Sequence, residues 1–155
     1  MTALWILRCK QSLLVGGTLF FMESFIIDKL AWVYLKDGKI LMTRSRGKDV
    51  CYIGGGKREQ GESDEAALMR EVEEEFTVCL IPESIRYLGV FEAQAHGKPK
   101  GTIVRMTCYT GEYIGILAPA AEIEELAWFT YGDRERIAPV DKIIFDWLKE
   151  RGMIQ

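Results

Sequence analysis

Residues 56–78 read GKREQGESDEAALMREVEEEFTV, and this stretch decides the fold. Its second half predicts a helix that begins after Ser63, a suitable N-cap followed by two acidic residues, and ends near Phe76. Leu68, Val72 and Phe76 recur every four residues and form one apolar stripe. The first half is rich in glycine and charge and predicts a loop. We therefore expect a loop followed by a helix that packs on a core through one face.

Glutamates gather on another face of this helix. Glu71, Glu74 and Glu75 lie at i, i+3 and i+4, so their side chains share one face, whereas Glu73 points elsewhere. Like charges at this spacing destabilise a helix by about 0.2 to 0.5 kcal/mol per pair, and the C-terminal half of a helix also disfavours anions. A divalent cation bound by carboxylate oxygens would relieve this repulsion, although most Glu-rich faces are simply solvated. The helix alone leaves both interpretations open.

Strands are predicted on both sides of this segment. Residues 31–35 and 40–44 are apolar runs joined through Asp37-Gly38, which predicts a hairpin, and residues 50–53 predict a short strand. Further strands are expected over 85–93, 103–113 and 125–130, after a turn at Pro82 and with a loop over 96–101.

A second helix is predicted over residues 139–149, with Pro139 in its first turn. Its buried side is expected to carry Ile143, Ile144, Trp147 and Leu148. The order of strands, helix, strands and helix, without repeats, favours an α/β fold in which a mixed β-sheet is sandwiched between α-helices in three layers, α/β/α.

Composition limits the functions to consider. The chain has 155 residues, enough for one domain, with a formal net charge of −3 and no long Lys/Arg run, which argues against binding to duplex nucleic acid. A small anionic ligand is compatible with this charge. The four cysteines form no CxxC pair and His96 is the single histidine, so a zinc site is not expected. We expect the cysteines to be reduced thiols and the protein to be cytoplasmic.

Residues 1–24 stand apart from the domain expected over residues 25–155. Gln11 to Met22 is uncharged and largely apolar, like part of a secretory signal, but it is too short to cross a bilayer and no A-x-A-like cleavage site follows. A non-native extension with Met22 as the true start, a docked extra strand, and a signal or anchor all stay open. No membrane association is required by any of the chemistry below.

The quoted stretch resembles the Nudix box, G-x5-E-x7-R-E-U-x-E-E-x-G-U, in which U is a bulky apolar residue. The fixed positions are Gly56, Glu62, the Arg70-Glu71 pair and the Glu74-Glu75 pair, and every position is met except the second glycine, which is Thr77. A match at so many positions over 23 residues is far more specific than a short glycine motif. The chain is identified as a member of the Nudix family, similar to MutT.

The resemblance implies a Nudix fold and a metal site. In the family the helix glutamates bind Mg²⁺ or Mn²⁺, which here corresponds to Glu71, Glu74 and Glu75, with the backbone carbonyl of Gly55 as an additional ligand. Glu62 and Arg70 are expected to orient the loop and the ligands through a buried ion pair. Glu122, in a later loop, is the candidate for a further ligand or the general base, with Glu71 as the alternative base and an ordinary exposed acid as the bland interpretation.

Substrate contacts are expected from a second set of residues. Arg44 and Arg46 leave the second strand near the box and could bind phosphate oxygens, or they are ordinary exposed charges. Gly56 and Lys57 of the box loop are further candidates. Asp141 falls where MutT-like relatives place a residue that hydrogen-bonds the base, although a helix N-cap explains it equally well.

Two positions depart from the family pattern. Thr77 replaces a glycine that would permit a left-handed C-cap, so we expect the helix to end with different geometry. Gly54 stands where relatives often carry proline, so we expect a floppier loop.

The implied function is hydrolysis of a diphosphate linkage in a nucleoside diphosphate joined to another group. Triphosphates, including those of oxidised purines, are the first hypothesis, with monophosphate and pyrophosphate as products. ADP-ribose or a nucleotide sugar is the nearest rival as substrate, and a catalytically silent nucleotide sensor is a rival of another class. Family members are often dimers, so a homodimer stays open.

Overall fold

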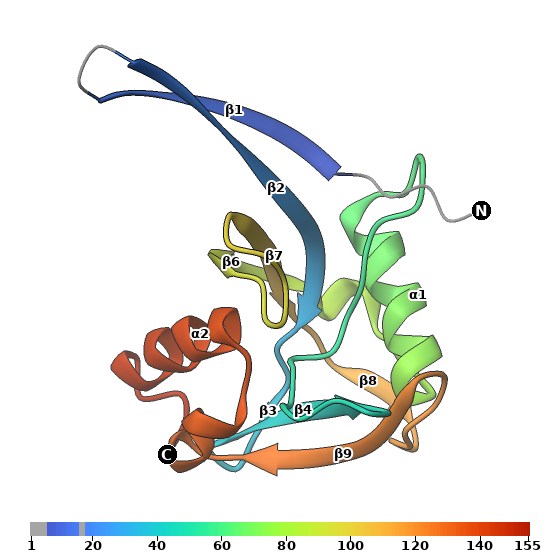
Figure 1. The fold of residues 1–155 in the computed structure, drawn as a ribbon. Helices are drawn as coiled ribbons and strands as arrows, with labels where there is room; N and C mark the ends of the chain where they lie inside the picture. The colour runs from blue at the N-terminus through green and yellow to red at the C-terminus, as the bar shows by residue number, and fades with distance from the viewer. Residues whose placement is uncertain (1–5, 16–17) are drawn as a thin grey trace.

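The computed structural model of the chain describes residues 6–15 and 18–155 (Figure 1). Its elements, in chain order, are β1 (Ile6–Val15), β2 (Thr18–Trp32), β3 (Leu35–Lys36), β4 (Lys39–Ser45), α1 (Asp64–Phe76), β5 (Val78–Leu80), η1 (Pro82–Ser84), β6 (Arg86–Gln94), β7 (Thr102–Thr110), β8 (Tyr113–Gly115), β9 (Ile123–Phe129), η2 (Tyr131–Arg136) and α2 (Pro139–Glu150).

The largest sheet is mixed and has the order β1-β2-β7-β6. Strands β2 and β7 are parallel, and the pairs β1·β2 and β6·β7 are antiparallel. A second, antiparallel sheet has the order β3-β4-β9, and β5 pairs antiparallel with β8. The expected mixed sheet is confirmed, but the strands divide among three sheets because β2 ends at Trp32 before β3 and β4 turn into the second sheet.

The two helices cover opposite faces of β2, as Figure 1 shows. Side chains alternate along a strand, so Leu30 and Trp32 enter one apolar cluster and Ala31 and Val33 the other. The first cluster contains the apolar stripe of α1, and the second contains the buried face of α2. This alternation produces the predicted α/β/α layers.

Helix α1 has the predicted bounds and the predicted cap. The Ser63 side chain accepts a hydrogen bond from the backbone N–H of Ala66 at 3.2 Å, and Leu68, Val72 and Phe76 are buried. The prediction for Thr77 is wrong, because this residue has φ 61° and ψ 23°, the left-handed C-cap conformation. Its backbone N–H donates to Glu73 O, and its hydroxyl donates to Ile116 O at 2.9 Å. These two hydrogen bonds hold a β-branched residue in a conformation that it disfavours.

Other predictions need correction in detail. The hairpin turn is confirmed, since Asp37 and Gly38 both have positive φ. Residues 50–53 form only two isolated bridges instead of a strand, and the run predicted over 103–113 breaks at Gly111 into β7 and β8. Ile143 was expected on the buried side of α2 but is 42% exposed, because Val140, Ile144 and Phe145 occupy that side.

The N-terminal segment forms a long hairpin. β1 pairs with β2 along its whole length, and in Figure 1 the N-terminal part of β2 and the strand β1 beside it reach beyond the helices. This pairing extends β2 back to Thr18, beyond the strand start predicted at Ala31 and the domain start expected at Phe25. Residues 1–5 and 16–17 lie outside the described residues, so the signal-like run over 11–22 is described only in part, and the status of residues 1–24 stays a prediction. None of the helices in the described part of the chain has the length and apolar character needed to cross a bilayer.

Candidate active site

Three consecutive glycines, Gly54 to Gly56, pass between β2 and α1. The backbone N–H groups of Leu30 and Trp32 donate to Gly56 O at 2.8 Å and to Gly54 O at 2.9 Å. A Cβ on Gly54 would lie 2.2 Å from Phe76 Cζ, and one on Gly56 would lie 2.1 Å from the carboxyl carbon of Glu71. The glycines are packed on both sides and only residues without a Cβ fit, which explains Gly54 at this position, while the expectation of a floppier loop stays a prediction.

Gly55 is the centre of this loop. Its φ of +136° is unfavourable for other residues, and a Cβ there would lie 2.3 Å from Leu30 O. Its N–H donates to Glu75 Oε2 at 2.8 Å. Within the described residues its carbonyl oxygen accepts no hydrogen bond. The loop thus holds Glu75 through one backbone group and leaves another free for a ligand.

Two of the helix glutamates belong to this site. Glu75 is only 5% exposed, and burial raises its pKa to about 7; Glu122 and Glu71 add to this shift, whereas Gly55 N–H and Lys29 oppose it. Burial also raises the pKa of Glu71, with Arg70 opposing the shift. Their ionised forms are therefore electrostatically disfavoured in the absence of a cation.

Glu74 differs from its two neighbours. Its side chain is 55% exposed and lies 3.5 Å from the Arg70 guanidinium. It is not among the residues that line the cavity described below. Its predicted role as a ligand therefore stays a prediction.

Arg70 holds the loop against the helix. Its Nε and Nη2 donate to the two oxygens of Glu62 at 2.8 and 2.9 Å, its Nη1 donates to Glu71 at 2.9 Å and its Nη2 also donates to Lys57 O at 3.0 Å. The Arg70 hydrogen bonds, helped by the N–H of Glu59, lower the pKa of Glu62 to about 2. The geometry is that of the expected ion pair, with both side chains largely buried.

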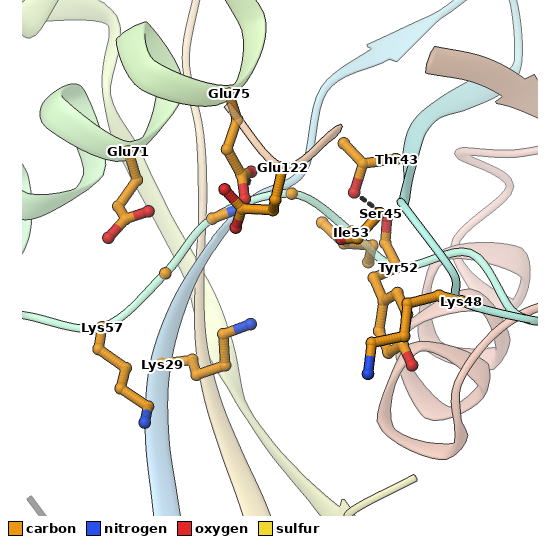
Figure 2. A pocket seen from close by; sticks show the side chains of 13 residues that line it. Lys29, Thr43, Ser45, Lys48, Tyr52, Ile53, Lys57, Glu71, Glu75 and Glu122 are labelled. Atoms are coloured by element: carbon orange, nitrogen blue, oxygen red, sulfur yellow. Dashed lines mark hydrogen bonds between the residues drawn. The ribbon is translucent and has the colours of Figure 1, made fainter. Parts of the chain in front are cut away.

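A cavity of about 440 Å³ lies beside the glycine loop. Figure 2 shows Glu71, Glu75 and Glu122 on one side and Lys29, Lys48 and Lys57 on the other. The remaining lining residues are Thr43, Ser45, Tyr52, Ile53 and the three glycines. The cavity can therefore receive a ligand that carries negative charge toward the lysines and a cation toward the carboxylates.

Glu122 enters the cavity from the loop before β9. Its backbone carbonyl accepts a hydrogen bond from Arg46 N–H at 3.0 Å, which fixes the loop beside the end of β4. No hydrogen bond to its carboxylate is found within residues 6–15 and 18–155, and the side chain is exposed. Glu122 thus lines the same cavity as Glu71 and Glu75, and its role as a ligand or general base stays a prediction.

The donor set suits a hard divalent cation. Three carboxylates and the free Gly55 carbonyl are oxygen ligands of the kind that Mg²⁺ and Mn²⁺ prefer. In the described part of the chain, no three acidic, histidine or cysteine side chains are already gathered around one point. The residues fit a metal by their chemistry and their common cavity, while coordination requires side-chain adjustment.

A second, smaller cavity adjoins the first. It measures about 210 Å³ and shares Lys29, Tyr52 and Lys57 with the larger one. Its remaining lining comes mainly from β2, β7, the loop before β7 and the start of α2, and includes the apolar residues Ile27, Ala95, Val104, Met106, Ala138, Pro139 and Val140. Gln94, His96 and Lys98 complete the lining, so this cavity is mainly apolar with polar groups at one part of its wall.

Three predicted substrate contacts lie elsewhere. Arg44 donates hydrogen bonds to Glu124 at 2.8 Å and to Glu125 at 2.9 Å. Neither Arg44 nor Arg46 lines either of the two cavities. Their phosphate-binding role stays a prediction. Asp141 is not a helix cap, because Ala138 is the N-cap of α2 and Asp141 is fully buried in its first turn.

The sequence analysis missed Lys29 and Tyr52. Lys29 lies on β2 outside any motif, and Tyr52 lies in an apolar run that read as a buried strand. One signal could have identified Lys29: it is a charged residue that lies between the apolar residues Ile27 and Leu30 of a strand.

Comparisons with known proteins agree with this fold. The family model of the NUDIX domain matches residues 29–148. Among solved structures, the E. coli ORF135 protein is 25% identical, with a TM-score of 0.64 over 81% of this chain and 91% of that chain. A search of curated protein sequences found no match.

Two other structures show the same fold. The MutT protein from Methanosarcina mazei Go1 is 16% identical, with a TM-score of 0.67 over 84% of this chain and 97% of that chain. A putative Nudix hydrolase family member from Chromobacterium violaceum is 22% identical, with a TM-score of 0.62 over 81% and 77% of the two chains. At these identities the likeness concerns the fold alone.

Proposed function

Since the chain belongs to the Nudix hydrolase family, we propose that it hydrolyses nucleoside triphosphates with the help of Mg²⁺ or Mn²⁺. As a Nudix pyrophosphohydrolase it acts on substrates in which a nucleoside diphosphate is linked to another group. The proposed products are a nucleoside monophosphate and pyrophosphate, and triphosphates of oxidised purines are included among the substrates. The observation that carries the proposal is the pair of adjoining cavities, one lined by carboxylates and lysines and one mainly apolar.

The larger cavity is proposed to hold the phosphates and the metal. Glu71 and Glu75 would hold the cation together with the Gly55 carbonyl, which leaves the carboxylate of Glu122 free. When bound, a divalent cation neutralises charge on phosphoryl oxygens and lowers the pKa of an attacking water. The lysines across the cavity offer charge-assisted hydrogen bonds to the remaining phosphate oxygens.

The choice of general base rests on which carboxylate is free. Glu71 accepts a hydrogen bond from Arg70, and Glu75 accepts one from Gly55, so both are oriented by the protein. The carboxylate of Glu122 has no such bond within the described residues and is exposed at the cavity. We therefore assign the role of proton acceptor to Glu122 in preference to Glu71.

The smaller cavity is proposed to hold the nucleobase. Its strand residues form an apolar floor, and about 210 Å³ is below the range of roughly 300–1,000 Å³ that accommodates a drug-sized ligand. A single ring system is therefore a better match than a whole dinucleotide. This size matches one nucleobase, which nucleoside triphosphates, ADP-ribose and nucleotide sugars all carry, so the nucleotide panel decides between these substrates.

The test is a panel of nucleotides with purified protein and Mg²⁺, with identification of the products. Turnover of triphosphates to monophosphate and pyrophosphate is expected, and it should fall by about two orders of magnitude or more in Glu75→Gln and Glu122→Gln. Glu73→Gln is the matched control, because Glu73 is on the same helix but exposed and away from the cavity. Release of AMP from ADP-ribose, with triphosphates left intact, would replace the proposed substrate class by the rival one.

A further inference from the structure

Lys29 stands at the junction of the two cavities. It lines both of them, and Figure 2 shows its side chain extending into the larger cavity across from the carboxylates. Its neighbour Asp28 points to the opposite face of β2, where it accepts a hydrogen bond from Arg58 at 2.9 Å. Ile27, two residues back, lines the smaller cavity together with Lys29. The alternation of the strand therefore directs this lysine to the substrate side.

The Lys29 ammonium has no partner of its own in the described chain. Neither a hydrogen bond nor an ion pair engages it within residues 6–15 and 18–155, although the residue is partly buried. By contrast, Arg58 is held by two carboxylates and Arg70 by three. A partly buried cation without a fixed partner is available to an anionic ligand.

The charge of Lys29 acts on both sides of the junction. Burial raises the pKa of Glu71 and Glu75 on α1 and of Asp141 at the start of α2, and the charge of Lys29 opposes each of these rises. The ammonium thus lies between the carboxylate end of the site and the end at which the base is proposed to bind.

We propose that Lys29 binds the phosphate that joins the organic group of the substrate to the cleaved linkage. The inference rests on the proposed function and deepens it, because it requires one phosphate at the junction, bonded directly to a group small enough for the smaller cavity. Nucleoside di- and triphosphates satisfy this requirement. Lys57 also lines both cavities, and its main chain is anchored by Arg70, so the two lysines face the same phosphate from β2 and from the glycine loop.

Binding of a phosphate by Lys29 does not require the metal, so it can be measured in the absence of a divalent cation. Binding is measured by calorimetry in EDTA, with the nucleoside monophosphate released from the best substrate of the panel and with the corresponding nucleoside. Wild-type protein should bind the monophosphate more tightly than the nucleoside. In Lys29→Met this preference should fall by about tenfold to a hundredfold, the usual effect of one hydrogen bond to a charged group, while nucleoside binding stays the same.

Two variants complete the experiment. Lys29→Arg keeps the charge and should retain most of the preference for the monophosphate. If Lys29→Met does not fold, Lys29→Gln replaces it, and Lys29→Arg serves as the folded reference. Lys36→Met removes an exposed lysine at the β3–β4 turn and should behave as wild type.

Two results would overturn the inference. One is a wild-type protein that binds the monophosphate no better than the nucleoside, and the other is a preference that survives in Lys29→Met. Either result, obtained with a protein that hydrolyses the panel, refutes the role of Lys29 and leaves the proposed function intact. A wild-type protein that hydrolyses no triphosphate refutes the proposed function itself.

Discussion

The buried carboxyl of Asp141 predicts a stability that declines as the pH rises. Asp141 is fully buried, and neither of its oxygens has a hydrogen-bond partner among the described residues. Burial raises its pKa from 3.8 to about 8, and Lys29 and the backbone of Ile53 offset this only in part. Between these two values the folded protein keeps a proton that the unfolded chain has lost.

The sign and size of the effect follow from this difference in proton binding. Because the folded state binds more protons, the free energy of unfolding falls as pH rises, by up to about 1.4 kcal/mol per pH unit. Over the interval from the unfolded to the folded pKa the loss is at most about 6 kcal/mol. Below the unfolded pKa both states are protonated, so the full stability is present and no longer changes with pH, and above the folded pKa the loss is complete.

The variant Asp141→Asn isolates this contribution. The amide does not titrate, so the free energy of unfolding of the variant should exceed that of wild type by an amount that grows from about pH 5 to about pH 8. Denaturant unfolding at several pH values measures the difference, and other titrating groups, Glu75 among them, cancel because both proteins carry them. Glu150→Gln, at the exposed end of the same helix, should leave the slope unchanged. Equal slopes in wild type and Asp141→Asn would refute the assignment of a proton to this carboxyl.

Three other substitutions have expected outcomes. Gly56→Ala places a Cβ 2.1 Å from the Glu71 carboxyl carbon and should lower kcat by about a hundredfold through displacement of that ligand; a kinetic assay with unchanged kcat would show that the loop can move aside. Arg70→Met leaves Glu62 and Glu71 without their guanidinium partner, so we expect both a lower melting temperature and weaker Mg²⁺ binding in calorimetry; an effect on neither would mean that the loop is held by other contacts. Thr77→Gly relieves the strain of the positive φ but removes the hydrogen bond from the hydroxyl to the neighbouring loop. Since the strain and the hydrogen bond are each worth about 1 kcal/mol and act in opposite directions, the free energy of unfolding should change by less than about 1 kcal/mol. A larger change in denaturant unfolding would show that the strain or the hydrogen bond dominates.

The parts of the fold that depend on local sequence were predictable. The bounds of α1, its Ser63 cap and its apolar stripe follow from neighbouring residues, and so does the hairpin turn at Asp37 and Gly38. The grouping of Glu71, Glu75 and Glu122 was also predictable, but only through resemblance to a family, because Glu122 is distant in sequence and joins the others through tertiary packing. The helix glutamates by themselves indicated a solvated face as readily as a metal site.

The features that the sequence analysis missed depend on long-range packing. The left-handed conformation of Thr77 is held by a hydrogen bond to a residue 39 positions away, which no local rule anticipates. The close packing of the glycine loop comes from Leu30, Trp32, Phe76 and Glu71, which surround it only in the folded chain. Lys29 was overlooked because a single lysine in an apolar strand has meaning only once the cavities beside it are known.

The buried carboxyls give the clearest indication that stability is exchanged for chemistry in this fold. A buried acid without a compensating charge destabilises the folded state, and such groups are rare unless they serve a function. Glu75 and Asp141 both have this character, and they lie on the two helices that cover opposite faces of β2. Lys29 reduces the unfavourable electrostatics at both, yet it keeps its ammonium free of either carboxylate within the described residues. An arrangement selected for stability alone would have paired the lysine with one acid, so the unpaired charges point to ligands, a cation for Glu75 and a phosphate for Lys29.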